Sequence, residues 1–462
     1  MAHERNLLLA AVIKELGWSQ EQLAGHFRRI AAEQGADELL SVNRNHIAQW
    51  LRGVKPSGHA PDILCATLSR GLGRVITPSA IGLAPADEAP AAPGWDADSV
   101  SALADLGSSS DMLSRRQVIG GSVYSAIGAV LPPEPWWQNR LAAAQRRVPL
   151  SRLTVSPVEV EAVREAAAFF SSRDQRLGGR AGRAALTTYL RTDVADYMAG
   201  RFPSEQVRRD LAAAAGELVY VAGWMDFDAG RQGSAQRGFE VALALAAEAD
   251  DAPLAGHILR AAAHQAVDLG HPGRALQLAE ASMDRRRYGQ ASSREKSLLG
   301  VVHARALAAS GRRQDALTAL LRAENDLSNA APAGSGEDPA RVGFFGEASL
   351  AHETACTLRD LGDLQGAETQ FQHSVRTRLL PFARTRAVTL GYLGDVQVRQ
   401  GHIEAGCATW DQALDAMVGL QSARARSTVV QMRRSLSPVR GRGGSVAARL
   451  DRRAQEFLRT VG

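Results

Sequence analysis

A glycine recurs at nearly equal intervals along residues 230–406 of this chain, each time followed five residues later by a small residue. Its intervals are 40, 41, 51 and 39 residues, and the long one contains an insertion rich in Ala, Pro, Gly and Ser at 329–338. A period near 40 indicates a solenoid of stacked helical hairpins. The pairs are Gly230 with Ala235, Gly270 with Ala275, Gly311 with Ala316, Gly362 with Ala367, and Gly401 with Gly406.

Composition favours helices throughout the chain. Alanine, leucine and arginine, which are good helix formers, recur everywhere, whereas β-branched residues are comparatively scarce and aromatic residues make up only 5%. At 462 residues the chain is too long for one ordinary core, so two or more domains are expected. We therefore predict an all-α protein in which the repeats form one domain among others.

The first 83 residues carry a different pattern, with short helices separated by capping and stop signals. An amphipathic helix at 1–16 is ended by Gly17. Ser19 can cap the next helix, and Gln22 follows it at the spacing of a capping box.

A third helix is predicted to begin after Asn43, which is a good N-cap residue. Its inward face is formed by Ile47, Trp50 and the adjoining leucine, and Gly53 ends it. We expect a further helix to begin at Pro61.

These residues resemble the Cro/lambda-repressor type (Xre family) of helix-turn-helix domain. The resemblance covers residues 6–83 and rests on Ser-Gln-x-x-Leu-Ala at 19–24 and Asn-Arg-Asn-His-Ile-Ala-Gln-Trp-Leu-Arg-Gly at 43–53, with Pro56 and Pro61 beyond them. It implies that the helix after Asn43 is the recognition helix, which lies in the major groove of double-stranded DNA.

One departure from that family concerns the segment between the second and third helices. Between Ala24 and Asn43 the chain is over ten residues longer than the tight turn of the simplest members. We expect the second helix to continue through 26–31, followed by a loop at 34–37, and a closing helix of the domain at 76–83.

The resemblance also implies which side chains contact DNA. Arginine suits guanine, and Asn or Gln suits adenine, while basic groups and helix N-termini suit phosphates. The alternative is that these polar residues form an ordinary solvated helix surface. The expected base-reading residues are Arg44, Asn45, His46 and Gln49, and the expected phosphate contacts are Ser19, Gln20, Arg52 and Lys55.

A linker is expected at 84–150, and its first part, 84–110, has the Pro, Ala and Ser content of a flexible tether. The twin arginines Arg115 and Arg116, followed by apolar residues, resemble an export signal, but they lie far from the N-terminus. The apolar run at 118–131 is too short to span a bilayer. We therefore expect a short apolar helix that docks on the repeats or on a partner chain.

The repeats resemble tetratricopeptide hairpins, most clearly in Asp-Leu-Gly-His-Pro-Gly-Arg-Ala-Leu at 268–276 and Leu-Gly-Asp-Leu-Gln-Gly-Ala-Glu at 361–368. The period exceeds the usual 34 residues of that family, so longer helices or connections are expected. We place the repeat domain at 151–436. The resemblance implies a concave groove that binds a peptide or protein effector, and the combination of domains is similar to actinomycete regulators.

The net charge of +5 is concentrated at the C-terminus. Ten arginines against Asp451 and Glu456 give residues 421–462 a local charge of +8, so the rest of the chain carries about −3. A basic tail is therefore expected at 437–462, and it could add nonspecific attraction to phosphates.

Candidate chemical groups are few. Cys65, Cys356 and Cys407 match no disulfide or metal spacing, and each is expected to be a small buried residue. His257 and His264 lie seven residues apart on one helix face without a further ligand in the local sequence. We predict no catalytic residues, no metal site and no cofactor, and hence no enzyme.

Together these features predict a cytoplasmic transcription regulator without a membrane anchor, which binds double-stranded DNA as a homodimer. The repeat domain would bind a peptide or protein effector or mediate oligomerisation. The main alternative is a protein-interaction scaffold that no longer reads DNA. A third interpretation is a regulator tethered to the membrane by residues 115–131.

Overall fold

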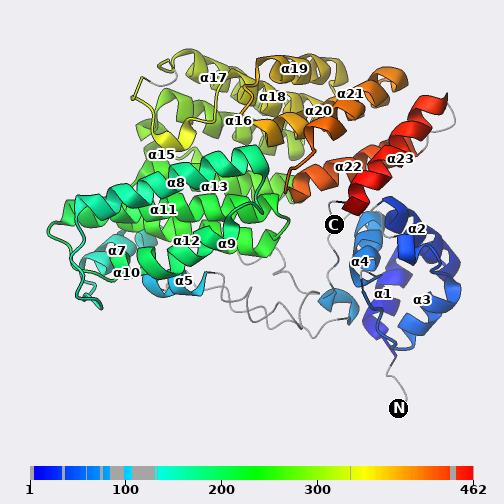
Figure 1. Cartoon of the computed structure of the whole chain (residues 1–462), viewed down its shortest axis with the longest axis horizontal. Coiled ribbons are helices and arrows are strands. Elements are labelled where there is room, and N and C mark those ends of the chain that lie inside the picture. The colour runs from blue at the N-terminus through cyan, green and yellow to red at the C-terminus, as the bar shows by residue number, and fades with distance from the viewer. Residues whose placement is uncertain are drawn as a thin grey trace. The chain divides into compact units, whose positions relative to one another are not determined.

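A computed structural model describes residues 5–33, 37–58, 60–72, 76, 78–83, 98–106, 131–132, 134–332, 335–437 and 444–460. These residues are mainly helical, and β pairing among them is limited to an isolated bridge between Thr154 and Arg201 (Figure 1). The all-α prediction is therefore confirmed for the described part of the chain. The described residues form two compact units, one containing 5–83 and 429–460 and the other containing 98–428.

The first unit begins with short helices around a small apolar core. Leu23, Phe27, Ile47 and Leu64 are fully buried in this core. The elements are α1 (Leu7–Leu16), α2 (Gln20–Glu33), the 3₁₀ helix η1 (Asp37–Leu39), α3 (Arg44–Leu51), α4 (Ala60–Leu72) and the 3₁₀ helix η2 (Ser79–Ile81).

Asn6 holds the ends of three of these elements together. Its side-chain oxygen accepts a hydrogen bond from the backbone N–H of Leu9 (2.9 Å) and thereby caps α1. Its side-chain nitrogen donates to the carbonyl of Ile81 (2.7 Å), and its backbone N–H donates to the carbonyl of Leu51 (3.0 Å). One residue therefore connects the start of α1 with the end of α3 and with η2.

Two expectations for this unit are modified. The second helix continues as predicted and ends at Glu33, while 34–36 lie outside the described residues and Asp37 already begins η1. The closing helix expected at 76–83 is a single 3₁₀ turn, because Pro78 precedes it and Gly82 follows it with a φ of 67°. Little room remains between these two residues for a regular helix.

The second unit consists of longer helices, and most of them are paired with their neighbour in the chain. Its elements are α5 (Ser99–Asp105), α7 (Glu134–Gln145), α8 (Pro157–Leu177), α9 (Arg183–Tyr189), the π-helical turn η3 (Leu190–Val194), α10 (Ala195–Met198), α11 (Glu205–Asp228), α12 (Gln232–Ala249), α13 (Ala252–Asp268), α14 (Pro272–Ser282), α15 (Arg285–Gln290), α16 (Ser293–Ala309), α17 (Arg313–Ser328), the 3₁₀ helix η4 (Ala340–Val342), α18 (Glu347–Asp360), α19 (Leu364–Thr377), α20 (Ala383–Arg399) and α21 (Ile403–Ala416), with α22 (Ala423–Leu436) divided between the two units.

The periodic glycines lie at the turns of five helical hairpins, as the spacing predicted. Their φ values are between 76° and 91°, a left-handed conformation that glycine adopts without steric cost. The small residues that follow at four of the turns, Ala235, Ala275, Ala316 and Ala367, are fully buried between the paired helices. The hairpins are α11–α12, α13–α14, α16–α17, α18–α19 and α20–α21.

The segment expected to be a tether contains an ordered helix. In α5, Leu103 is fully buried and the hydroxyl of Ser99 donates to Oε1 of Glu248 on α12 (2.6 Å). α7 also packs against α12, and Arg147 just beyond it forms an ion pair with Glu248 (2.9 Å). The linker interpretation of 84–150 is therefore wrong for 98–106 and 134–150, which belong to the second unit.

The remaining parts of that segment, 84–97 and 107–130, lie outside the described residues, and with them the twin arginines. Among the helices that the structure does describe, none combines the length and the apolar character needed to cross a bilayer.

In the second unit, a helix near the start of the array contacts a helix of the last hairpin. α8 packs against α11 and also against α20. Both carboxylate oxygens of Asp174 on α8 accept hydrogen bonds from Arg384 on α20 (2.6 Å each), across 210 residues of chain. The backbone N–H of Gln421 donates to the carbonyl of Leu177 (2.7 Å), which fixes the same junction through the main chain.

The hairpin turns predict opposite effects for two neighbouring glycines. Gly270 has a φ of 76° and Gly273 lies in the first turn of α14, and a Cβ at either position would meet nothing within 4 Å. Gly270→Ala should lower the free energy of unfolding by about 1–2 kcal/mol because of backbone strain. Gly273→Ala should raise it by up to about 1 kcal/mol. Urea unfolding of both variants would contradict this if both changes had the same sign.

Candidate nucleic-acid interface

The start of α3 is fixed by a capping box with an unusual member. The side-chain oxygen of Asn43 accepts from the backbone N–H of Asn45 (3.0 Å), as expected for an N-cap residue. In return, Nδ1 of His46 accepts from the backbone N–H of Asn43 (3.3 Å), where Glu or Gln is usual. The sequence indicates Asn43 as the cap but does not reveal the part that His46 plays in it.

The two sides of α3 differ in character. Ile47 and Trp50 are buried, and the ring of Trp50 lies against Phe27 of α2 with the centroids 5.4 Å apart. Arg44, Asn45 and Gln49 are all exposed. At 3.6 residues per turn these three positions span an arc of about 140° on the side away from the core. The structure thus brings the expected base-reading residues together on one accessible helix surface.

His46 is also exposed, but its Nδ1 belongs to the cap, so Nε2 is the ring atom that remains for a further contact. Arg28 of α2 donates to the carbonyl of Val42 (2.8 Å) and so fixes the segment that leads into α3. This contact was not predicted, since a lone arginine on a helix gives no indication of a backbone partner fourteen residues away.

The expected phosphate contacts lie at the start of α2 and after α3. The hydroxyl of Ser19 accepts from the N–H of Gln22 (3.2 Å), and Oε1 of Gln22 accepts from the N–H of Ser19 (2.8 Å), which is the predicted capping box. Gln20 is half-buried in the first turn of α2. Arg52 and Lys55 both lie after the end of α3, and both are exposed.

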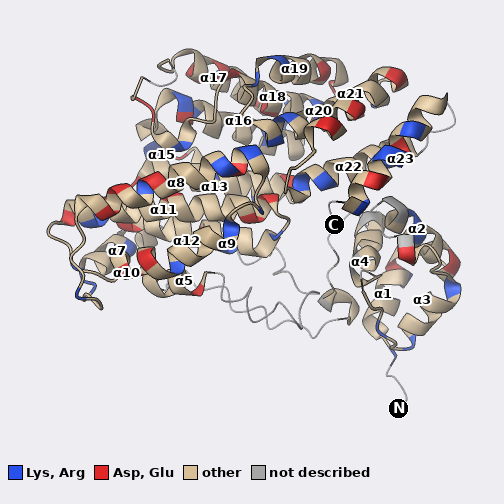
Figure 2. Ribbon diagram, viewed as in Figure 1, with Lys and Arg blue, Asp and Glu red and all other residues tan. Residues whose placement is uncertain are grey.

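The C-terminal segment expected to be a basic tail contains α23 (Gly444–Thr460). Four of its apolar residues are buried at helical spacing, and Nε of Arg433 on α22 donates to Oδ1 of Asp451 on α23 (2.9 Å). Figure 2 shows basic residues along both helices, and the acidic residues of this pair, Asp451 and Glu456, belong to α23. The segment is therefore in large part a packed amphipathic helix. The four buried residues are Ala447, Leu450, Ala454 and Leu458.

The two histidines of α13 have carboxylate neighbours that the local sequence did not reveal. Nδ1 of His257 lies 3.3 Å from Glu295, and His264 lies 3.6 Å from both Asp268 and Glu353. Within the described ranges no group of His, Cys, Asp and Glu has the arrangement of a metal site. The three cysteines are buried and form no disulfide with one another.

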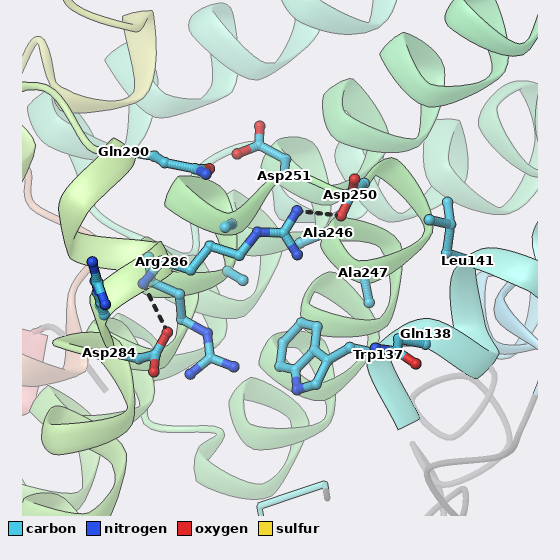
Figure 3. A pocket seen from close by; sticks show the side chains of 14 residues that line it. Trp137, Gln138, Leu141, Ala246, Ala247, Asp250, Asp251, Asp284, Arg286 and Gln290 are labelled. Atoms are coloured by element: carbon cyan, nitrogen blue, oxygen red, sulfur yellow. Dashed lines mark hydrogen bonds and ion pairs between the residues drawn. The ribbon is translucent and has the colours of Figure 1, made fainter. Parts of the chain in front are cut away.

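A surface pocket of the second unit lies between α7, α12, α13 and α15 (Figure 3). Arg286 binds Asp250 (2.7 Å), and its backbone N–H donates to Asp284 (3.0 Å). The guanidinium of Arg287 lies 4.6 Å from the ring centroid of Trp137. Three arginines and three aspartates line this pocket, so its charges balance internally.

Comparison with known families gives a match within the first unit. Residues 9–84 match the family model of the SP15 N-terminal domain. This segment contains most of α1 and all of the elements from α2 to η2, but it is less than a fifth of the chain, and the helical hairpins lie outside it. Comparisons with curated proteins and with solved structures found no match.

His352 on α18 predicts a pH dependence of the second unit. Its Nδ1 lies 2.8 Å from the hydroxyl of Thr389, and burial lowers the pKa of His352 to about 3. The unfolded chain takes up this proton near pH 6.5, so the stabilising contribution of neutral His352 is lost as the pH falls from about 6.5 toward 3.

Well below pH 6.5 this histidine should therefore remove about 1.4 kcal/mol from the free energy of unfolding for each pH unit. His352→Gln should flatten the stability profile between pH 5.5 and 4 by about this slope. Thr389→Val, which removes the hydrogen bond but keeps the imidazole, should lower stability without flattening the profile. An unchanged slope in His352→Gln, measured by denaturant unfolding, would contradict the assignment.

Proposed function

We propose that this protein is a sequence-specific, DNA-binding transcription regulator. The observation that carries the proposal is the accessible arc of α3, where Arg44, Asn45 and Gln49 lie opposite the buried Ile47 and Trp50. These are the side-chain types that read base edges in the major groove, and they occupy the N-terminal part of a capped helix.

In the proposed complex α3 enters the major groove of double-stranded DNA. Arg44 donates to O6 and N7 of a guanine, while Asn45 and Gln49 pair with adenines. His46 has Nε2 available for an adjacent base or phosphate. Arg52, Lys55 and the start of α2 at Ser19 and Gln20 contact the phosphates and set the orientation of the helix.

The small positive charge of residues 1–80, about +2, favours binding by a homodimer. Phosphate contacts supply much of the affinity of such domains, and one copy offers few basic groups on this surface. Two copies on paired half-sites double both the base contacts and the charge. The helical hairpins would then mediate oligomerisation, bind a peptide or protein effector, or do both in the cytoplasm. The alternative remains a scaffold that acts through the hairpins alone.

The first test is genome-wide DNA capture with the full-length protein and with an Arg44→Ala/Gln49→Ala double variant. Each bidentate base contact contributes about 1–3 kcal/mol, so the variant should bind discrete sites roughly tenfold or more weakly. Lys14→Ala, which removes the same charge from α1, is the matched control and should keep those sites. An absence of enriched sites, or sites unchanged in the double variant, would favour the scaffold.

The proposed phosphate contacts can be tested separately from the base contacts. Arg52→Gln/Lys55→Gln should weaken binding to all sequences about equally, because phosphates carry no sequence information. The slope of log K against log salt should become shallower by about 0.9 for each phosphate that is no longer neutralised. A fluorescence titration of labelled duplexes at several salt concentrations measures this slope. A change in site preference without a change in slope would show that these residues do not contact phosphates.

A further inference from the structure

The five hairpins of the second unit each contribute their first helix to a common cavity. The side chains around it come from α11, α13, α16, α18 and α20, and also from α8, α22 and the segments that precede α18 and α20. Arg378, at the end of α19, completes the lining. All of these residues belong to the same compact unit.

The charged groups in and around this cavity do not balance. Among the residues that line the cavity and their direct ion-pair partners, five guanidinium groups meet four carboxylates, an excess of one positive charge within this set. No carboxylate among the described residues forms an ion pair with Arg260 or Arg378. The paired groups are Arg384 with Asp174 (2.6 Å) and Asp228 (3.6 Å), Arg305 with Asp268 (2.6 Å) and Glu353 (3.2 Å), and Arg424 with Asp268 (3.2 Å).

Arg260 is 2% exposed and has only neutral neighbours within hydrogen-bond range. One terminal nitrogen donates to the hydroxyl of Tyr220 (2.9 Å) and lies 3.2 Å from Nε2 of His257. The guanidinium also lies 5.7 Å from the ring centroid of Trp224. Its Nε is buried without a hydrogen-bond partner in the described structure. A buried donor of this kind costs free energy unless an acceptor binds it.

Arg378, directly after α19, is also buried and also lacks an ion-pair partner among the described residues. Its terminal nitrogens donate to the carbonyl of Ala348 (2.7 Å), to Ser374 (3.0 Å) and to Ser349 (3.4 Å), all of them neutral acceptors. Burial lowers the pKa of Arg378 to about 10. Its Nε also has no partner among the described residues.

The rest of the lining is mainly apolar or neutral. Burial lowers the pKa of His264 and of His352, so neither imidazole adds a positive charge at neutral pH. The wall between the arginines is aromatic and aliphatic, which suits an apolar molecule more than a hydrated ion. Its residues are Trp224, Leu298, Val302, Phe344, Phe345, Phe382 and Val388.

We propose that this cavity binds a small organic anion, whose carboxylate or phosphate group is held by Arg260 and Arg378 and whose apolar body packs against the aromatic wall. One bound anion offsets this charge and supplies acceptors for the Nε–H groups of Arg260 and Arg378, which lack a partner among the described residues. Guanidinium groups favour carboxylate and phosphate because they donate two parallel hydrogen bonds.

This inference narrows the effector in the proposed function, and its regulatory part rests on that function. Arg424 lies in the cavity lining at the start of α22, and residues of the same helix from 429 onward belong to the first unit. Binding of the anion itself does not require that the protein binds DNA.

The test is calorimetric titration and thermal unfolding of the full-length protein with benzoate, phenyl phosphate, inorganic phosphate and benzamide. Saturable binding of benzoate or phenyl phosphate is expected, and whichever binds more tightly identifies the anionic group. Benzamide has the shape of benzoate without its charge and should bind at least tenfold more weakly. Equal binding of benzamide, equal binding of inorganic phosphate and phenyl phosphate, or no binding at all would overturn the proposal.

Arg260→Gln and Arg378→Gln should each weaken anion binding at least tenfold. Arg312→Gln is the matched control, because Arg312 forms surface ion pairs with Glu280 and Asp315. If the cavity variants do not fold, hydrogen exchange of the wild-type protein decides the question. Benzoate-dependent protection confined to segments 257–264, 349–353 and 378–388 supports the site, and protection elsewhere or none overturns it.

DNA binding measured in the same samples separates the two proposals. Anion binding without DNA binding leaves the cavity assignment intact and removes the regulatory function. Specific DNA binding without any response to these anions removes the cavity assignment alone.

Discussion

The junction between α8 and the last hairpin is the contact on which the second unit depends. Asp174 and Arg384 meet there at 2.6 Å, and the hydroxyl of Ser422 donates to Asp228 (2.9 Å), all of them buried. Breaking a buried ion pair by removing one partner costs about 3–5 kcal/mol, because the other charge is left without compensation. Hairpins stacked only on their neighbours would leave the inner helix faces open at both ends. The junction instead holds α8 against α11 and α20, and the cavity lies among the helices that it connects.

The hairpins could be predicted from sequence, whereas this junction could not. A turn that requires a positive φ selects glycine, and the close approach of paired helices selects a small residue, so each hairpin leaves a local signature such as Gly362 with Ala367. The partner of Asp174 lies 210 residues away and follows no period. α5 was missed for a different reason, since seven residues with two buried apolar side chains, Val100 and Leu103, are too few to show helical periodicity.

Most residues of the candidate interface could be identified from the sequence, because they are close together in the chain. Arg44, Asn45 and Gln49 belong to one eight-residue helix, so the positions of Ile47 and Trp50 determine which side they occupy. What the sequence did not show was how the helix is held. Asn6 and Arg28 do this through backbone carbonyls, and a carbonyl acceptor has no residue type by which a pattern could identify it. The cavity could not be predicted from the sequence, because its residues come from many helices. Each of its charged residues looks like an ordinary polar residue in its own segment.

The two sites place different demands on stability. The exposed polar residues of α3 cost little folding free energy, since water satisfies their hydrogen-bonding groups; in the proposed complex DNA replaces this water. Arg260 and Arg378 are desolvated, and each retains a buried N–H group that no described residue accepts. Replacing such a charge by an apolar side chain of similar volume is often neutral or stabilising, so packing alone does not account for either arginine. Proteins retain a locally unfavourable arrangement of this kind where function requires it, which is the physical reason for assigning a ligand to this cavity rather than a structural role alone.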